Sequence, residues 1–159
     1  MNDREVFLSY AREDQARVTQ ILEALLKRGF PVFFDREMIS GVEWEKVLES
    51  RLQDAYAVVV VWSSHSVKKA TQESGWILRE ATIGLEKGRL FPIQIESGLT
   101  IPEPFKHIQA ADLSEWDPDV NDSEFDRKIS LLRALWVSEQ GLLKDEKVWP
   151  IRLKTRTGT

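Results

Sequence analysis

The sequence predicts an α/β fold, a parallel sheet with helices on both faces, and two observations support this prediction. Short apolar runs alternate along the chain with segments whose apolar residues recur at helical spacing, which is typical of strands joined by crossover helices. The run AVVVVW at residues 57–62 has no polar position, as expected of a central parallel strand covered on both faces. A chain of 159 residues suits one such domain with a short appendage.

Five strands are predicted from the apolar runs. They are VFLS at 6–9, PVFFD at 31–35, AVVVVW at 57–62, LFPIQI at 90–95 and a short edge strand, IQAADL, at 108–113. The alternation with helices favours a flavodoxin-like three-layer sandwich with strand order 2-1-3-4-5, in which ligands lie beyond the carboxyl ends of the strands where the order reverses. Residues 63–66 are expected on one side of that crevice. Its other side supplies three candidate substrate-binding residues, Ser9, Tyr10 and Arg12.

Four helices are predicted around these strands. They span residues 13–28, residues 44–52, a segment from near Glu73 to near Gly88, and residues 124–136. Gly29 is expected to end the first helix, as a glycine at a helix C-terminus does. The polar segment at 63–74 is expected to lead into the third helix, and His65 within it is interpreted as part of a surface loop.

The third helix brings an aromatic ring and a carboxylate together. Trp76 and Glu80 are i,i+4 neighbours, and Glu80 is expected about two turns into the helix. Both lie at the margin of the expected buried stripe, which consists of Ile77, Leu78, Ala81 and Leu85. From periodicity alone, Glu80 is either a solvated charge at the border of the helix or a residue that lines a functional site.

Composition excludes several classes of function. A net charge of −4 argues against binding to nucleic acid. The chain has no cysteine, and its two histidines, His65 and His107, are far apart in sequence, so no metal site is expected. The N-terminus lacks the pattern of a signal peptide, and the longest apolar run is too short to span a bilayer. A cytoplasmic protein without membrane contact is therefore expected.

The usual chemistries of this sheet topology lack their motifs. A receiver domain would need a phosphate-accepting aspartate at the end of the third strand, where Ser63 stands instead. A flavin-phosphate loop would need glycines after the first strand, and none is present there. The eight glycines form neither the dinucleotide-fold nor the P-loop fingerprint, and no elbow motif supports a Ser-His-Asp triad.

An ordered series of stretches resembles the TIR domain, particularly its bacterial members. The series is EVFLSYARED at 5–14, GFPVFFDREMISGVEW at 29–44, AYAVVVVWSSHSV at 55–67 and SGWILREATIGL at 74–85. LFPIQI and IPEPF, further along, resemble the usual fourth strand and the loop after it. The resemblance covers residues 4–137.

The resemblance implies an activity. WILRE at 76–80 is similar to the W-x-x-x-E motif of TIR domains that cleave NAD, in which the glutamate is catalytic and matches Glu80. Such enzymes take NAD⁺ as substrate, need no cofactor, and leave nicotinamide with ADP-ribose or a cyclic isomer. Many bacterial members serve anti-phage defence by depleting NAD or making a signal. The loop after the second strand, residues 36–43, is implied to control access and homotypic assembly.

A single carboxylate is chemically sufficient for this reaction. The bond between ribose C1′ and a cationic pyridinium breaks, and the leaving group departs neutral, so no strong acid is required. The sugar becomes oxocarbenium-like, and a carboxylate beside it can stabilise the growing positive charge. The alternative function is a non-catalytic interaction module that signals through TIR–TIR contacts.

Further candidate substrate-binding residues each have a plainer interpretation. Arg12 could hold a phosphate by charge-assisted hydrogen bonds or be an exposed loop cation. Asp35 could shape the site or cap its turn. Trp44 could flank the pocket or begin the core face of the second helix, and Trp76 could contact substrate or belong to the core.

The domain is expected to span residues 1–137. Residues 138–159 are interpreted as a linker or tail toward a further domain, because they contain more basic than acidic residues, a proline and two glycines. Seven acidic residues and no basic ones lie between Asp112 and Asp126. This run is expected to be solvated surface around a helix N-terminus, where negative charge suits the helix dipole.

Overall fold

The computed structural model of the chain describes residues 4–34, 44–71 and 75–139. Five parallel strands form one sheet in the order β2-β1-β3-β4-β5, which confirms the predicted topology. The strands are β1 (Val6–Ser9), β2 (Val32–Phe33), β3 (Ala57–Trp62), β4 (Leu90–Gln94) and β5 (Ala111–Asp112). All six residues of β3 are buried, as the unbroken apolar run predicts for the central strand.

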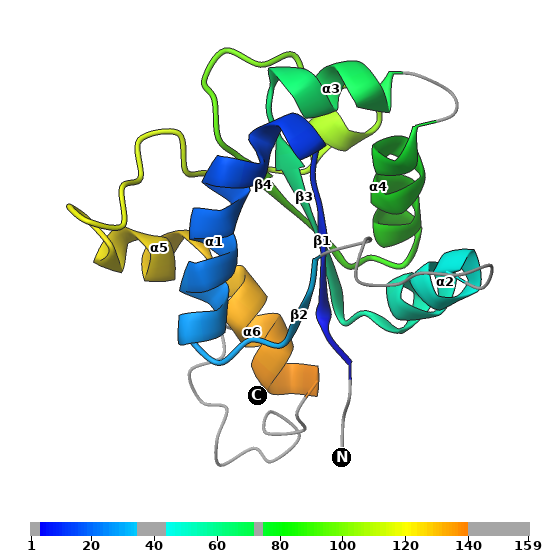
Figure 1. Cartoon of the computed structure of the whole chain (residues 1–159), viewed down its shortest axis with the longest axis horizontal. Helices are drawn as coiled ribbons and strands as arrows, with labels where there is room; N and C mark the ends of the chain where they lie inside the picture. The colour runs from blue at the N-terminus through cyan, green and yellow to red at the C-terminus, as the bar shows by residue number, and fades with distance from the viewer. Residues whose placement is uncertain (1–3, 35–43, 72–74, 140–159) are drawn as a thin grey trace.

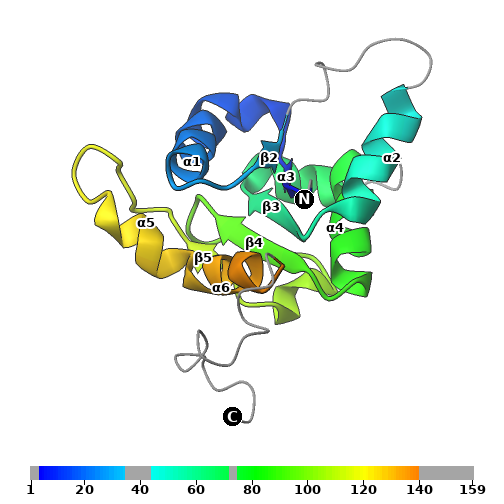
Figure 2. The same cartoon turned by 90° about the horizontal axis from the view of Figure 1, so that it is seen from below.

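Helices cover both faces of the sheet (Figures 1 and 2). One face carries α1 (Gln15–Lys27), α5 (Ser123–Lys128) and α6 (Ser130–Glu139), which share a core cluster with side chains of β1, β3 and β4. The other face carries α2 (Trp44–Asp54), α3 (Ser64–Ala70) and α4 (Trp76–Glu86). The predicted three-layer sandwich is therefore present. No helix among the described residues is long and apolar enough to cross a membrane.

The first predicted helix has a different start. The short 3-10 helix η1 (Arg12–Asp14) precedes α1, and α1 itself begins at Gln15. Its end agrees with the prediction, because Gly29 has a φ of +92°, a backbone conformation that glycine adopts at little cost.

Two further helices differ from the prediction. The polar segment after β3 contains the additional helix α3, which begins with a reciprocal cap: Ser63 accepts from the Ser66 N–H, and the Ser66 hydroxyl accepts from the Ser63 N–H. This arrangement satisfies two backbone donors that a helix start leaves open. The last predicted helix is divided at Ile129 into α5 and α6.

Arg28, which follows α1, connects that helix to α5. Its Nε donates to Asp126 Oδ1 at 2.7 Å, and a terminal nitrogen donates to Asp122 Oδ2 at 3.2 Å. The guanidinium also lies over the Phe125 ring, 4.8 Å from the centroid. Part of the acidic run is therefore paired with a cation instead of being only solvated.

We expect the Arg28–Asp126 contact to make stability depend on pH. The hydrogen bond from Arg28 holds the pKa of Asp126 below its ordinary value. A depressed pKa in the folded state contributes stability above the unfolded value of about 3.9, and this contribution is lost as the pH falls through the folded pKa. Asp126→Asn should therefore lower the free energy of unfolding at pH 7 by less than about 1 kcal/mol, since the side chain is largely exposed.

Urea unfolding of wild type and variant at pH 7 and pH 3 measures this difference. The difference between the two proteins should be largest at pH 7 and smaller at pH 3, where the carboxyl group is partly protonated. Asp119→Asn, at an exposed acidic position of the same segment, is the control. A constant difference at both pH values would contradict the expectation.

Candidate active site

Glu80 lies inside the protein. It follows the first turn of α4, which begins at Trp76, so it is about one turn into the helix, and the predicted two turns were wrong. The residue is only 3% exposed, which corrects its expected place at the margin of the buried stripe. The buried residues of the helix are Ile77, Glu80, Ala81 and Gly84.

The carboxylate of Glu80 is held from the sheet. Ser9, the last residue of β1, donates its hydroxyl proton to Glu80 Oε1 at 2.7 Å. Ser9 is itself fully buried, whereas the expected direct contact with substrate needs an accessible hydroxyl. The structure instead places Ser9 where it orients Glu80, because a hydrogen bond to a charged acceptor is stronger than one between neutral groups.

Glu80 also borders a cavity between α2 and α4. The cavity has a volume of about 270 Å³ and is lined by Leu48, Glu49, Leu52, Trp76, Arg79 and Glu80. Trp76 is 45% exposed, so it does not pack wholly beneath Glu80 as expected. The structure does bring the two predicted residues of α4 to the same cavity.

A charged pair forms part of the cavity wall. Arg79 of α4 and Glu49 of α2 form an ion pair across the two helices. A hydrogen bond from Gln53, with a further contribution from Arg79, holds the pKa of Glu49 below its ordinary value. Glu49 is therefore ionised at neutral pH. The wall of the cavity thus consists of the half-exposed indole of Trp76, apolar side chains, the Glu49–Arg79 ion pair and the Glu80 carboxylate, which Ser9 holds from the sheet.

The sequence did not single out four of the lining residues. On α2, Leu52 is a neighbour of both Leu48 and Glu49 through spacings of four and three residues, and on α4 Arg79 precedes Glu80. The sequence could not identify Glu49 as a lining residue, because its partner Arg79 is thirty positions away and the two meet only in the folded protein.

Of the remaining predicted site residues, two lie away from the cavity, and the side chains of the other two lie outside the described part of the chain. Tyr10 is partly buried against the core cluster on the α1 face, and Arg12 is exposed in η1. Neither lines the cavity. Trp44 is the first residue of α2, but its side chain lies outside the described part. Asp35 and the loop at 36–43 also lie outside the described residues.

His65 differs from its expected loop position. It lies in the first turn of α3, and its Nδ1 is 3.0 Å from Asp14 Oδ1. Among the described residues, Asp14, His65 and Glu96 are the group whose side chains could together hold a metal ion. None of the three lines the cavity beside Glu80.

Comparison with known proteins gives a family and two similar folds. The family model described as "TIR domain" matches residues 6–129. The TIR domain of the Toll-related receptor TRR-2 from Hydra magnipapillata is 19% identical, with a TM-score of 0.63 over 82% of this chain and 96% of that chain. The TIR domains of the activated Roq1 resistosome, which recognises the pathogen effector XopQ, are 17% identical, with a TM-score of 0.58 over 82% and 99%. The curated proteins contain no match to the chain.

Proposed function

Because the chain belongs to the TIR domain family, we propose that it is an enzyme that cleaves the nicotinamide–ribose bond of NAD⁺. The products are nicotinamide and ADP-ribose or a cyclic isomer of it. Glu80 is the catalytic residue in this proposal. Its support from the sequence is the W-x-x-x-E motif at residues 76–80, which resembles that of NAD-cleaving members.

The observation that carries the proposal is the environment of Glu80. A buried carboxylate is costly unless hydrogen bonds compensate for lost water, and Ser9 supplies one from the end of β1. The same carboxylate borders a cavity that also presents a half-exposed tryptophan. A fixed carboxylate at the edge of a cavity is the arrangement expected of a group that acts on a bound molecule, since electrostatic stabilisation works best when the group is oriented beforehand.

In the proposed reaction the C1′–N bond breaks, and its electron pair moves onto the pyridinium nitrogen. Nicotinamide leaves as a neutral molecule, while positive charge develops on C1′ and the ring oxygen of the ribose. Glu80 stabilises that charge. A water molecule, or a nucleophilic group of the same dinucleotide, then forms the new bond to C1′, and any proton that this nucleophile loses passes to solvent.

The cavity suits one end of the dinucleotide. Small-molecule sites typically have volumes of about 300–1,000 Å³, and this one is slightly smaller at about 270 Å³. It therefore takes the nicotinamide and its ribose, with the diphosphate outside. Trp76 offers an aromatic face for the cationic pyridinium, an attraction that is lost when the ring leaves as a neutral molecule.

Self-association is the proposed means of activation. The family resemblance assigns assembly to residues 36–43, which precede α2 and hence the wall of the cavity. The Roq1 structure contains TIR domains within an assembled complex, and the fold of this chain is similar. We place the enzyme in the cytoplasm and in prokaryotic anti-phage defence. The alternative is a non-catalytic module that uses the same contacts for signalling.

Mass spectrometry of NAD⁺ incubated with purified protein tests the proposal. Protein should be assayed dilute, under crowding, and after forced clustering through a fused oligomerisation domain. Release of nicotinamide with an equal amount of ADP-ribose or its isomer is the expected result. Absence of turnover in protein that is shown to be clustered would favour the interaction module.

Ser9→Ala provides a second test of the same site. A hydrogen bond to a charged group contributes about 1.5–3 kcal/mol, so a carboxylate that loses it should be less well oriented. We expect kcat for NAD⁺ cleavage to fall by about 10–100-fold, which is the same free energy expressed as a rate. KM should change little, because Ser9 is buried and does not reach the substrate.

Steady-state kinetics of wild type and Ser9→Ala, with circular dichroism to verify folding, measure this effect. Ser64→Ala is the control, because that serine contacts Glu96 and not Glu80. An unchanged kcat in a folded Ser9→Ala variant would contradict the orienting role of Ser9.

A further inference from the structure

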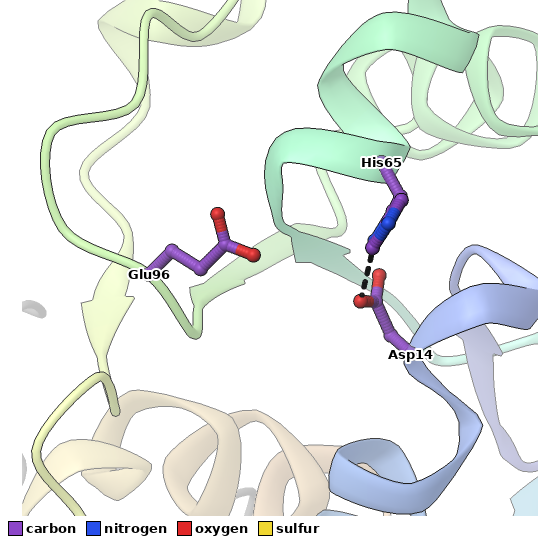
Figure 3. Close-up of side chains that lie close together, drawn as sticks. All are labelled: Asp14, His65 and Glu96. Atoms are coloured by element: carbon purple, nitrogen blue, oxygen red, sulfur yellow. Dashed lines mark hydrogen bonds and ion pairs between the residues drawn. The ribbon is translucent and has the colours of Figure 1, made fainter.

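Three side chains of metal-ligand type converge at the carboxyl edge of the sheet. Asp14 ends η1 after β1, His65 is in the first turn of α3 after β3, and Glu96 follows β4. Because β1, β3 and β4 are adjacent parallel strands, residues that follow them meet at one edge. Their potential ligand atoms all lie within 4.8 Å of one another. Figure 3 shows the Asp14 and His65 side chains facing each other, with the Glu96 carboxylate directed toward them.

The spacing of these atoms is close to that of a metal site. In tetrahedral zinc sites the metal lies about 2.0–2.2 Å from nitrogen and oxygen ligands, so neighbouring ligand atoms are about 3.3 Å apart. Asp14 Oδ1 and His65 Nδ1 are separated by 3.0 Å. Glu96 needs only a small side-chain movement to join them, and it is partly exposed, so rotation about its side-chain bonds is available.

Both carboxylates already have partners at the start of α3. Ser63 donates its hydroxyl proton to Asp14 Oδ2, leaving Oδ1 toward the imidazole. The Ser64 N–H donates to Glu96 Oε1 at 3.1 Å. Ligating carboxylates in metal sites are commonly oriented by such outer hydrogen bonds. Asp14 is only 8% exposed, so one ligand is fixed in the protein while the other two remain accessible to an ion from solvent.

We propose that Asp14, His65 and Glu96 bind a divalent transition-metal ion of the zinc type. The imidazole favours zinc over magnesium or calcium, which prefer oxygen ligands alone. Two carboxylates and a neutral imidazole neutralise the charge of the ion. Three protein ligands leave one tetrahedral position for water. The ion connects the segments that follow β1, β3 and β4, and the site is separate from the proposed NAD⁺ cavity, so it does not depend on that proposal.

The chain offers a matched control for this site. His107 also lies beside a carboxylate, with Nε2 2.9 Å from Glu103 Oε1, but that pair is exposed and has no third ligand in the described part of the chain. The protein contains no other histidine. His65→Ala and His107→Ala therefore remove the same kind of side chain from the proposed site and from a simple surface pair.

Isothermal titration of tag-free protein with ZnCl₂, after dialysis against a chelator, tests the proposal. We expect one ion per chain in wild type and in His107→Ala. Outer hydrogen-bond partners contribute about 10–100-fold to metal affinity, and a direct ligand contributes more, so His65→Ala should weaken binding by about 100-fold or more. Glu96→Gln, from a separate segment, should weaken it as well.

Thermal unfolding with and without ZnCl₂ gives an independent readout. Zinc should raise the Tm of wild type and of His107→Ala, and it should raise that of His65→Ala much less, because only binding to the folded state stabilises. No tight binding by wild type, or equal binding by His65→Ala, would overturn the proposal. So would a loss of binding in His107→Ala alone.

Discussion

The Glu80→Gln variant is expected to release nicotinamide from NAD⁺ about 10²–10³-fold more slowly than wild type, the range measured when a single electrostatic group is removed from an active site. Glutamine keeps the size of the side chain and can still accept the hydrogen bond from Ser9. It removes the negative charge that stabilises the developing oxocarbenium ion. The variant should therefore fold normally and fail in the chemical step.

Nicotinamide release by clustered protein, followed by mass spectrometry, measures this loss. Glu49→Gln is the matched control, since it removes a second carboxylate from the wall of the same cavity. Its effect should be much smaller, because the Glu49 side chain is 38% exposed and water screens its charge, whereas Glu80 is buried. Equal rates for wild type and Glu80→Gln would exclude Glu80 from the reaction. Equal losses in both variants would indicate that the charge of the whole cavity matters.

The sheet was predictable because local patterns determine it. A short run of β-branched valines without polar positions is typical of a strand covered on both faces, and Gly29 marks a helix end through its backbone freedom. The extra helix α3 was missed because its segment has little apolar periodicity and is only seven residues long. Its start is stabilised by the reciprocal Ser63–Ser66 cap, which differs from the usual pairing of a hydroxyl residue with Glu or Gln.

The site was predictable only where one helix contains it. Trp76 and Glu80 are neighbours through helical spacing, so their closeness follows from the sequence, but the cavity between α2 and α4 does not. The hydrogen bond that fixes Glu80 does not follow from the sequence, because its donor, Ser9, is 71 positions away. The grouping of Asp14, His65 and Glu96 likewise depends on strand order. Contacts between distant segments arise from the tertiary structure, so the local pattern of apolar residues does not predict them.

The close approach of α4 to the sheet depends on Gly84. A Cβ atom built at this position would lie 2.8 Å from Val58 Cβ and 3.2 Å from Val58 Cγ2. Val58 is buried in the central strand β3, and its Cβ is attached directly to the backbone, so no side-chain rotation can move that atom away. Either the helix or the strand must shift when a side chain is added.

Gly84→Ala is therefore expected to destabilise the protein, although alanine is the better helix former. Alanine in a helix interior gains about 1 kcal/mol over glycine, whereas overpacking a core typically costs about 1–3 kcal/mol. The overpacking cost is expected to dominate, giving a net loss of up to about 2 kcal/mol in the free energy of unfolding. Gly84→Val should lose more, since its two methyl groups meet the same strand. A displaced α4 should also lengthen the bond between Ser9 and Glu80, so NAD⁺ cleavage should fall with stability.

Urea unfolding of the two variants, together with their rates of NAD⁺ cleavage, shows whether helix propensity or overpacking against Val58 determines stability. Glu86→Ala, at an exposed position of the same helix, is the control and should stay within about 0.5 kcal/mol of wild type. A Gly84→Ala variant more stable than wild type would mean that helix propensity outweighs the contact with Val58, and that α4 can move outward at little cost. In that case the hydrogen bond from Ser9 would fix the position of Glu80 more than the packing of α4 against the sheet does. Ser9→Ala would then reduce NAD⁺ cleavage more than Gly84→Ala does.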